Sequence, residues 1–278
     1  MDFGAWELSC GHKRNCEGTM GQDKEQIILE TKNLTKIYNQ QLENEFEALH
    51  DINFKAQAGE FLCVMGPSGS GKTTFINNIS TIDFPTKGQV FIDGVEIHSM
   101  SSNQLGRFRS QKLGFVFQEF NLLDTHTLYE NIAMPLALAK VKKAEIQKRV
   151  EEIAERMGIH ELLRKYPREC SGGQRQRGAI CRALVMNPKI VVADEPTGNL
   201  DRRSANEFLA MIDRLNKEEQ VTIIMVTHDP LIASYSSRLV YIKDGTIEQT
   251  IEKNEMNQKE YFRIITEINA SESKGFLE

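Results

Sequence analysis

Five consecutive apolar residues at positions 61–65 lead directly into a glycine-rich turn at positions 66–71. An unbroken apolar run of this length is typical of a β-strand that is covered on both faces. Lys72 and Thr73 follow the turn and complete the pattern G-x-x-x-x-G-K-[ST], and the residues after them favour a helix. A strand, a turn of this kind and a helix in that order predict an α/β core with a mainly parallel sheet.

This turn predicts a site for a nucleoside triphosphate. Glycines let consecutive backbone N–H groups curl around phosphate oxygens, and the N-terminus of the following helix adds a favourable dipole. Lys72 is expected to neutralise the β- and γ-phosphates, and Thr73 to offer its hydroxyl to Mg²⁺. The residues expected to contact the nucleotide here are Gly66, Ser68, Gly69, Ser70, Gly71, Lys72, Thr73 and Thr74. A turn without a ligand is the alternative, and the flanking strand and helix argue against it.

A second apolar run, residues 190–193, ends in the two acids Asp194 and Glu195. Because α/β sheets bind ligands at the carboxyl ends of their strands, both acids are expected beside the phosphate-binding turn. We predict that Asp194 holds Mg²⁺ and that Glu195 accepts the proton of the water that attacks the γ-phosphate. Two acids after a strand are otherwise a common solvated turn, so the catalytic interpretation depends on the motif upstream.

Strand and helix patterns alternate along the rest of the chain. The β-rich runs lie at residues 27–31, 52–56, 60–65, 89–97, 114–117, 189–193, 221–227 and 239–243. Two of the first three are expected to pair antiparallel, and the Asp93-Gly94 turn predicts a hairpin. Between residues 118 and 186 the pattern is helical, which predicts a helical insertion.

Composition excludes several classes of protein. The net charge of −5 argues against a strongly basic nucleic-acid binder, and the longest apolar stretches are far too short to span a bilayer. The five cysteines include no C-x-x-C pair and are expected to be reduced. Cys10, His12 and Cys16 could form the corner of a zinc site, but a second pair of ligands is missing, so loose surface residues are the favoured interpretation.

A third motif identifies a family. Ser171-Gly172-Gly173-Gln174, followed by a helix, resembles the signature motif of ATP-binding cassette (ABC) ATPases, and the resemblance covers residues 28–245. It implies a P-loop NTPase (RecA-like) α/β core, an antiparallel β subdomain and an α-helical insertion that carries the signature motif. We therefore expect a disordered N-terminal extension at residues 1–26, the ATPase domain at 27–252 with a helical subdomain at about 119–186, and a helical tail at 253–278.

The resemblance also implies roles for single residues. Tyr38 corresponds to the aromatic residue that stacks on adenine, and Gln118 to the glutamine that reaches the metal and the lytic water. Asp201 lies in the loop that joins two nucleotide sites, and His228 corresponds to the histidine near the γ-phosphate. The signature residues Ser171, Gly172, Gly173 and Gln174 are expected to contact nucleotide as well. Cys170 and Cys181 depart from the usual pattern, and we expect altered helix packing and some sensitivity to thiol reagents.

In this family the signature motif of one subunit contacts nucleotide that the other subunit holds. A chain with a single set of motifs is therefore expected to bind ATP and Mg²⁺ in a head-to-tail dimer with a second copy of itself. Because the chain has no membrane span of its own, it is expected to drive a separate integral membrane permease at the cytoplasmic face of the membrane. The candidate contact residues near Gln118, most of which are expected in the core, are Phe120, Leu122, Leu123, Leu128, Tyr129 and Ile132.

Further motifs resemble the lipoprotein-release and macrolide-export group, and most closely the ATPases of bacterial antimicrobial-peptide (bacitracin-type) resistance exporters. This resemblance implies export of, or resistance to, antimicrobial peptides, and extends weakly to a docking helix with Tyr261, Phe262, Ile264, Ile265 and Ile268. A DNA-repair or chromosome-maintenance ATPase is the alternative, but Lys72 and Ser171 are too close in sequence for its long coiled coil. A regulator without turnover is disfavoured because Glu195 and His228 are both present.

Overall fold

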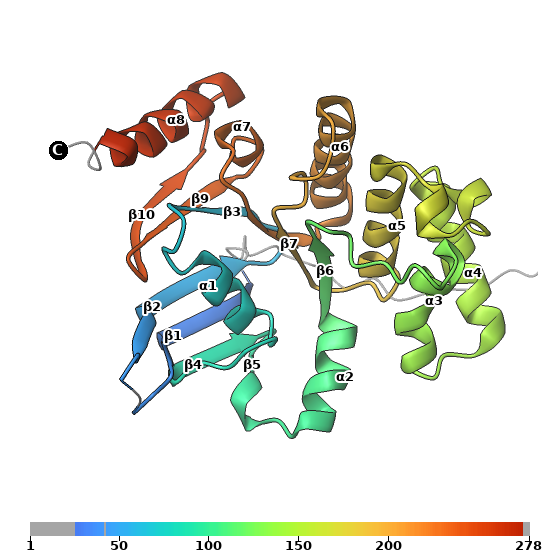
Figure 1. Cartoon of the computed structure of the whole chain (residues 1–278), viewed down its shortest axis with the longest axis horizontal. Coiled ribbons are helices and arrows are strands. Elements are labelled where there is room, and N and C mark those ends of the chain that lie inside the picture. Colours follow the sequence, from blue (N-terminus) through green and yellow to red (C-terminus); the bar gives the residue numbers. More distant parts are fainter. Residues whose placement is uncertain (1–25, 42, 275–278) are drawn as a thin grey trace, which may run out of the picture.

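The computed structural model describes residues 26–41 and 43–274, and its central layer is a sheet of six strands in the order β10-β9-β3-β8-β7-β6 (Figure 1). The strands are β3 (Phe61–Met65), β6 (Leu113–Phe117), β7 (Ile190–Asp194), β8 (Thr222–Val226), β9 (Arg238–Lys243) and β10 (Thr246–Glu252). All neighbours pair parallel except β9 and β10. The predicted α/β fold with a mainly parallel sheet is therefore confirmed.

A second, antiparallel sheet has the order β2-β1-β4-β5. Its strands are β1 (Ile27–Tyr38), β2 (Phe46–Gln57), β4 (Lys87–Ile92) and β5 (Val95–Glu96). The predicted hairpin at Asp93-Gly94 joins β4 to β5, with Ile92 opposite Val95. β1 runs seven residues beyond its predicted end, because an irregularity in its pairing around Asn33, which has a φ of 50°, interrupts the alternating pattern without ending the strand.

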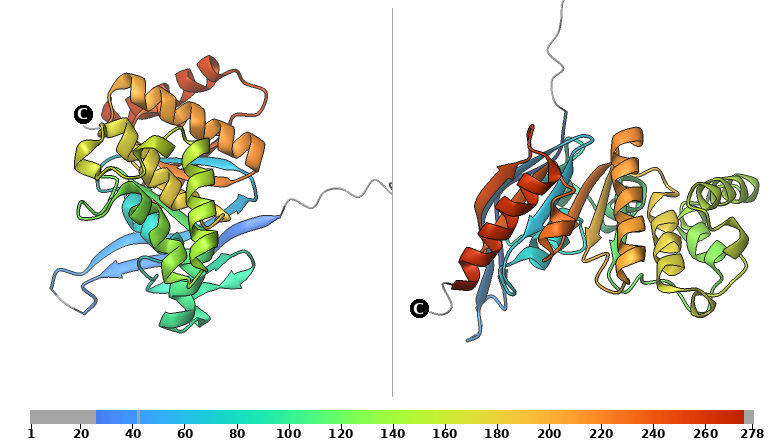
Figure 2. Two further views of the ribbon diagram at one scale, coloured as in Figure 1. Left: turned by 90° about the vertical axis from the view of Figure 1, so that its right-hand side faces the viewer. Right: turned by 90° about the horizontal axis from the view of Figure 1, so that it is seen from above.

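Eight α-helices pack against the sheets or against one another in the described part of the chain. They are α1 (Lys72–Ile79), α2 (Ser102–Lys112), α3 (Leu128–Leu138), α4 (Lys143–Arg156), α5 (Gly172–Leu184), α6 (Arg202–Glu219), α7 (Pro230–Ala233) and α8 (Gln258–Lys274). α3, α4 and α5 lie between β6 and β7 in sequence and gather at the end of the molecule opposite α8 (Figure 2). This is the predicted helical insertion, and α5 carries the signature motif at its N-terminus.

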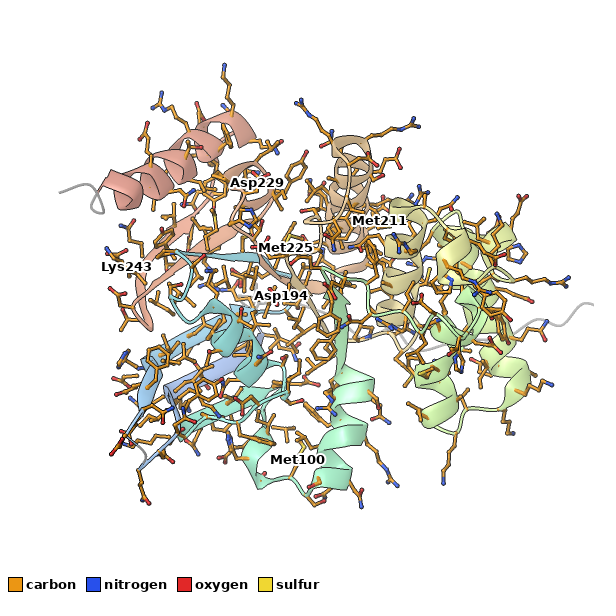
Figure 3. All side chains as sticks on the ribbon, viewed as in Figure 1. Met100, Asp194, Met211, Met225, Asp229 and Lys243 are labelled. Carbon is orange, nitrogen blue, oxygen red and sulfur yellow. The ribbon has the colours of Figure 1, made fainter. Side chains whose placement is uncertain are left out.

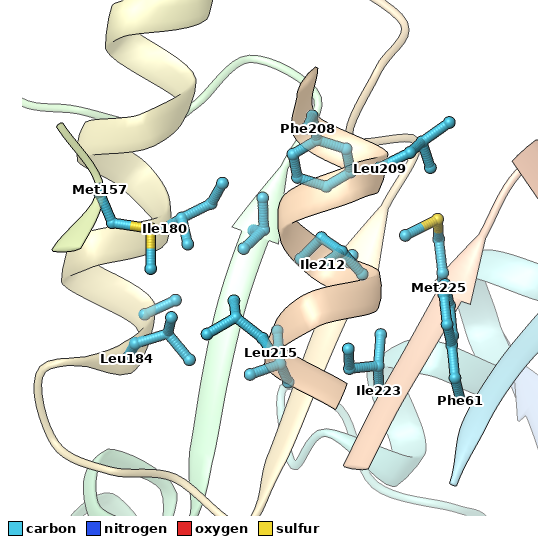
Figure 4. Packing of buried hydrophobic residues seen from close by; sticks show 14 of the residues in the cluster. Phe61, Met157, Ile180, Leu184, Phe208, Leu209, Ile212, Leu215, Ile223 and Met225 are labelled. Carbon is cyan, nitrogen blue, oxygen red and sulfur yellow. The ribbon is translucent and has the colours of Figure 1, made fainter. Parts of the chain in front are cut away.

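The core has two parts, one on each face of the parallel sheet. Along β3, Phe61, Cys63 and Met65 join the cluster beneath α5 and α6, whereas Leu62 and Val64 join the cluster that includes α1. This alternation explains the unbroken apolar run, because both faces of β3 are covered. In the first cluster Phe208, Ile212 and Leu215 of α6 pack between α5 and the strand that carries Ile223 and Met225 (Figure 4).

The C-terminal helix α8 packs on its own domain, against α7 and the edge of the parallel sheet. Tyr261 and Ile265 are both 0 % exposed, and the Tyr261 hydroxyl donates a hydrogen bond to the Ile251 carbonyl over 3.0 Å. Residues 1–25 of the expected extension, with Cys10, His12 and Cys16, lie outside the described residues. Within the part that the structure does describe, no helix is both long and apolar enough to cross a membrane.

Candidate active site

The glycine-rich turn links the end of β3 to the start of α1. Gly71 precedes α1 with a left-handed φ of 101°, and a Cβ atom there would lie 2.6 Å from the Ala48 carbonyl oxygen, so only glycine fits. No side chain caps α1 and no acidic residue lies in its first turn. The N-terminal amides of α1 are therefore open to an anion from outside.

At this turn the Lys72 side chain has a hydrogen-bond partner that a ligand could replace, and the Ser70 side chain has none among the described residues. Lys72 Nζ donates to the Pro67 carbonyl oxygen over 2.7 Å, a neutral acceptor that a phosphate oxygen could replace. Burial lowers the pKa of Lys72, although the charges of Glu195 and Asp194 act in the opposite direction. Ser70 Oγ is buried and finds no hydrogen-bond partner in the described structure. An orphaned hydroxyl beside a lysine fits a cradle that is completed by a ligand's oxygen atoms.

Asp194 ends β7 at the carboxyl edge of the sheet and lies at the centre of the molecule (Figure 3). In the strand register Asp194 pairs with Val226, and Val226 pairs with Val64, two residues before the glycine-rich turn. Burial raises the pKa of Asp194, the charge of Glu195 raises it further, and the charge of Lys72 opposes both. A carboxylate that gains from a neighbouring cation is a suitable metal ligand.

Glu195 has the unusual backbone φ of 44°. Its N–H donates to the Val226 carbonyl, and its carbonyl accepts from the Gly198 N–H, each over 3.0 Å. These two bonds hold a conformation that is costly for a residue with a Cβ atom. The Glu195 Oε1 atom lies 2.8 Å from His228 Nδ1, and the His228 side chain is 78 % exposed. The acid and the histidine, predicted separately, thus form one hydrogen-bonded pair that opens to solvent.

Gln118 follows β6 and lies beside the loop that follows Glu195. A Cβ atom at Gly198 would lie 2.8 Å from Gln118 Nε2, and Asn199 Nδ2 donates to the Gln118 carbonyl oxygen over 3.1 Å. In the described part of the chain, no three His, Cys, Asp or Glu side chains converge as they would in a protein-only metal site. A Mg²⁺ ion here would therefore depend on Thr73, Asp194 and Gln118 together with phosphate oxygens, which is how proteins commonly bind this ion.

The signature motif caps its own helix. Ser171 Oγ accepts a hydrogen bond from the Gln174 N–H over 3.3 Å, and Gln174 Oε1 accepts from the Ser171 N–H over 2.9 Å. Asp201 caps α6 in a similar way, and the hydrogen bond from the Ser204 backbone N–H and that from the Ser204 hydroxyl lower its pKa. Gly172 and Gly173 lie against the loop and first turn of α6.

The helices that follow the phosphate-binding turn and the signature motif pack into different core clusters, on opposite faces of the parallel sheet. α1 packs on β1, β2, β7 and β8, whereas α5 packs on α3, α4, α6 and β6. The structure thus brings Lys72, Asp194, Glu195 and His228 to one edge of the sheet and leaves Ser171 exposed on another part of the molecule. The roles predicted for all these residues toward nucleotide stay predictions.

Sequence reasoning missed the surroundings of Tyr38, at the end of β1. Tyr38 Oη donates a hydrogen bond to Asp83 Oδ2 over 3.0 Å, and Asp83 also pairs with Lys36. The expected sensitivity to thiol reagents finds no support. Cys170 and Cys181 are both buried, and burial raises the pKa of both thiols, which disfavours the reactive thiolate.

Comparison with known proteins decides the family. The model of the ABC transporter family matches residues 49–198. The ABC transporter ATP-binding protein YxdL of Bacillus subtilis is 46% identical over 86% of this chain and 92% of its own length. The chain belongs to the ABC transporter family. It is the ATP-binding subunit of a transporter and couples ATP hydrolysis to transport, and the resemblance read from its motifs is confirmed.

Two further relatives are informative about the group. The bacitracin export ATP-binding protein BceA of Halalkalibacterium halodurans is 44% identical over 86% of this ABC ATPase and 94% of its own length. The ATP-binding cassette MJ0796 of Methanocaldococcus jannaschii was solved as a dimer in a post-hydrolysis state bound to ADP and Pi. It superposes with a TM-score of 0.74 at 38% identity, over 81% of this chain and 98% of that one.

Proposed function

We propose that this ABC ATPase drives a separate integral membrane permease that exports antimicrobial peptides or protects the cell from them. The ATPase part of the proposal depends on one observation, the convergence of Lys72, Asp194 and the Glu195–His228 pair at the carboxyl edge of the parallel sheet. The cargo class is supported by the 44% identity with a protein named for bacitracin export.

In the proposed reaction Lys72 Nζ exchanges the Pro67 carbonyl for phosphate oxygens, and the α1 amides with Ser68, Gly69 and Thr74 enclose them. Thr73, Asp194 and Gln118 would hold Mg²⁺, which supplies positive charge against the phosphates. Glu195 accepts the proton of the attacking water, and His228 orients the carboxylate through the 2.8 Å contact. The strained φ of Glu195 supports this role, because such conformations persist where function requires them.

A second copy of the chain is needed to complete each site. Ser171 is exposed, and α5 and α1 pack on opposite faces of the parallel sheet, which supports a site in which the signature motif comes from the second copy. A head-to-tail dimer would close around ATP because charge-assisted hydrogen bonds to the γ-phosphate favour the closed state, and hydrolysis would remove them. The dimeric cassette bound to ADP and Pi supports this arrangement.

The permease has a suitable docking place near Gln118. A groove of about 400 Å³ lies between α2, β6 and α3, and it is lined by Phe115, Phe117, Met134 and Leu138 among others. Leu138 is 77 % exposed, which is unusual for a large apolar side chain. Of the six contact residues suggested by the sequence, Phe120, Leu128 and Ile132 are buried in the chain's own core, Leu122 and Tyr129 are half-buried, and Leu123 is exposed. Docking here would place the chain at the cytoplasmic face of the membrane.

The competing ATPase class finds no support in the described structure. A DNA-repair or chromosome-maintenance ATPase would need a long coiled coil between the phosphate-binding turn and Ser171. In that interval the longest described helix is α4, with 14 residues. No nucleic-acid partner is therefore proposed.

Three measurements test the proposal. Lys72→Ala should abolish tight ATP binding in an equilibrium titration, and normal affinity would contradict the phosphate-binding assignment.

Co-purification tests the docking place. An integral membrane protein should co-purify with the wild type and not with the Leu138→Asp variant. It should still co-purify with Leu231→Asp, the control at a similarly apolar and 43 % exposed leucine of α7. Cells that lack the chain should become more sensitive to bacitracin, and the Lys72→Ala variant should not restore resistance.

A further inference from the structure

The Tyr38 side chain contacts two charged residues, Asp83 and Lys36, that the sequence analysis did not single out. Tyr38 Oη donates to Asp83 Oδ2 over 3.0 Å, and Lys36 Nζ donates to Asp83 Oδ1 over 2.8 Å. The same lysine nitrogen lies 4.9 Å from the centre of the Tyr38 ring, within the range of a cation–π contact. The Lys36 side chain is only 12 % exposed, so the cluster is a packed part of the structure.

Asp83 connects this ring to the helix of the phosphate-binding turn. The Ile82 and Asp83 N–H groups both donate to the carbonyl oxygen of Asn77 in α1, over 2.9 and 3.0 Å. On the other side the Asp83 carboxylate holds Lys36 and Tyr38 of β1. The position of the ring is thereby tied to α1, the helix that begins at Lys72.

The free Tyr38 ring would have little reason to keep one orientation. It lies half-buried at the last residue of β1, and Asn39 follows with a left-handed φ of 54°. The hydrogen bond to Asp83 fixes the hydroxyl end of the ring, and Lys36 covers one face. A planar base that stacks on this ring would therefore do so on the face opposite Lys36.

We propose that Asp83 is a positioning residue that holds the Tyr38 ring for stacking on the base of the bound nucleotide, with Lys36 covering the other face of the ring. This inference rests on the proposed function, and on Tyr38 as the base-stacking residue. Its consequence is that Asp83 contributes to recognition of the base and leaves recognition of the phosphates unchanged.

The ionisation of Asp83 suits this role. Burial acts to raise the pKa of Asp83, but hydrogen bonds from Lys36, the Phe84 N–H and Tyr38, together with the charge of Lys36, hold it below its ordinary value. The carboxylate is therefore ionised at neutral pH, and both of its oxygen atoms accept hydrogen bonds. Ionised acceptors make stronger hydrogen bonds than neutral ones.

The test compares ATP with inorganic triphosphate, which has the phosphates and no base. Asp83→Ala and Tyr38→Phe should each weaken ATP binding by about 3- to 10-fold, because an oriented ring loses part of its stacking contribution. The double variant should be no weaker than the single ones, and triphosphate affinity should stay unchanged in all of them. Asp213→Ala is the matched control: Asp213 is 30 % exposed against 32 % for Asp83, and each pairs with a lysine over 2.8 Å.

Two results would overturn the inference. If Asp83→Ala weakened triphosphate as much as ATP, Asp83 would act on α1 and not on the ring. If ATP affinity stayed at the wild-type level in Asp83→Ala or in Tyr38→Phe, the ring would need no positioning. Lys72→Ala separates these outcomes from failure of the proposed function, because it should abolish binding of both ligands, whereas the Asp83 variant should discriminate between them.

Discussion

Replacing Glu195 with glutamine removes the proton acceptor and its charge but keeps the size and shape of the side chain. Glutamine has nearly the same size, and its Oε1 atom can still accept a hydrogen bond from His228 Nδ1 across the 2.8 Å contact. The left-handed φ of 44° costs the same for both residues, since both carry a Cβ atom. The Glu195→Gln variant should therefore fold like the wild type and keep the site's geometry.

The magnitude follows from the role of a general base. Loss of such a group costs about 10²- to 10⁴-fold in rate, which corresponds to about 3 to 5 kcal/mol of transition-state stabilisation. Nucleotide binding should not weaken, because removal of the Glu195 charge relieves one of the two causes that raise the pKa of Asp194. Loss of the Glu195 charge favours the ionised form of Asp194, which is the form that can bind Mg²⁺. A large fall in kcat with unchanged affinity is the expected pattern.

Phosphate release at saturating Mg²⁺ and ATP measures turnover, and an equilibrium titration measures affinity. Glu119→Gln is the matched control, because Glu119 is an exposed acid next to Gln118 and should be nearly neutral. With ATP, the Glu195→Gln variant should also accumulate as a dimer in gel filtration, since hydrolysis no longer opens it. Wild-type rates of phosphate release in this variant would refute the assignment and would point to another base.

Three other substitutions test the scaffold. Gly66→Ala places a Cβ atom 1.9 Å from the Ile242 carbonyl oxygen and should cost ATP affinity more than 10-fold in a titration, whereas Gly106→Ala, with no atom within 4 Å, should be tolerated. Ile265→Ala removes a fully buried side chain of α8 and should lower the free energy of unfolding by about 2 to 5 kcal/mol in urea titrations. Asp194→Asn should raise the Tm by about 1 to 3 °C at pH 7, after allowance for solvent screening. Burial, then the charge of Glu195, raises the pKa of Asp194 in the folded state. Its ionisation therefore lowers stability as the pH rises from about 3.9, the unfolded-state pKa, to the folded-state pKa, and the cost is constant at higher pH. The gain of the Asn variant should therefore vanish below about pH 3.9.

Local patterns were sufficient for much of this fold. The run at 61–65 and the turn after it specify β3, the loop and α1, because strand burial, glycine geometry and helix start are all short-range properties. The Asp93-Gly94 hairpin followed from turn chemistry alone. α2 was missed although Ser101 and Gln104 form a capping box, a signal that is readable from sequence. β10 was also missed, and its weak alternation reflects an edge strand that is largely exposed.

The parts of the site that depend on tertiary contacts could not be predicted from sequence. Tyr38 and Asp83 are 45 residues apart, and only the pairing of β1 with β4 and the return from α1 bring them together. The left-handed φ of Glu195 is likewise imposed by a hydrogen bond to β8, a strand that begins at Thr222. Sequence motifs predict the reactive groups. The residues that orient these groups lie far away in the sequence and meet them only in the folded structure.

The helix α5 contacts both the loop after Glu195 and the turn after Gln118. Ser171 lies at its N-terminus, and the buried Gln176 donates to the carbonyl oxygen of Pro196, directly after Glu195, over 2.8 Å. Near the other end Arg182 donates to the carbonyl oxygens of Phe120 and Asn121, in the turn after Gln118. A helix is stiff along its axis, so a displacement of that turn must either break these charged hydrogen bonds or move α5 as a body. If the permease docks at the apolar groove, which adjoins the same turn, we expect a displacement there to be carried through α5 to the signature motif and to the loop after Glu195.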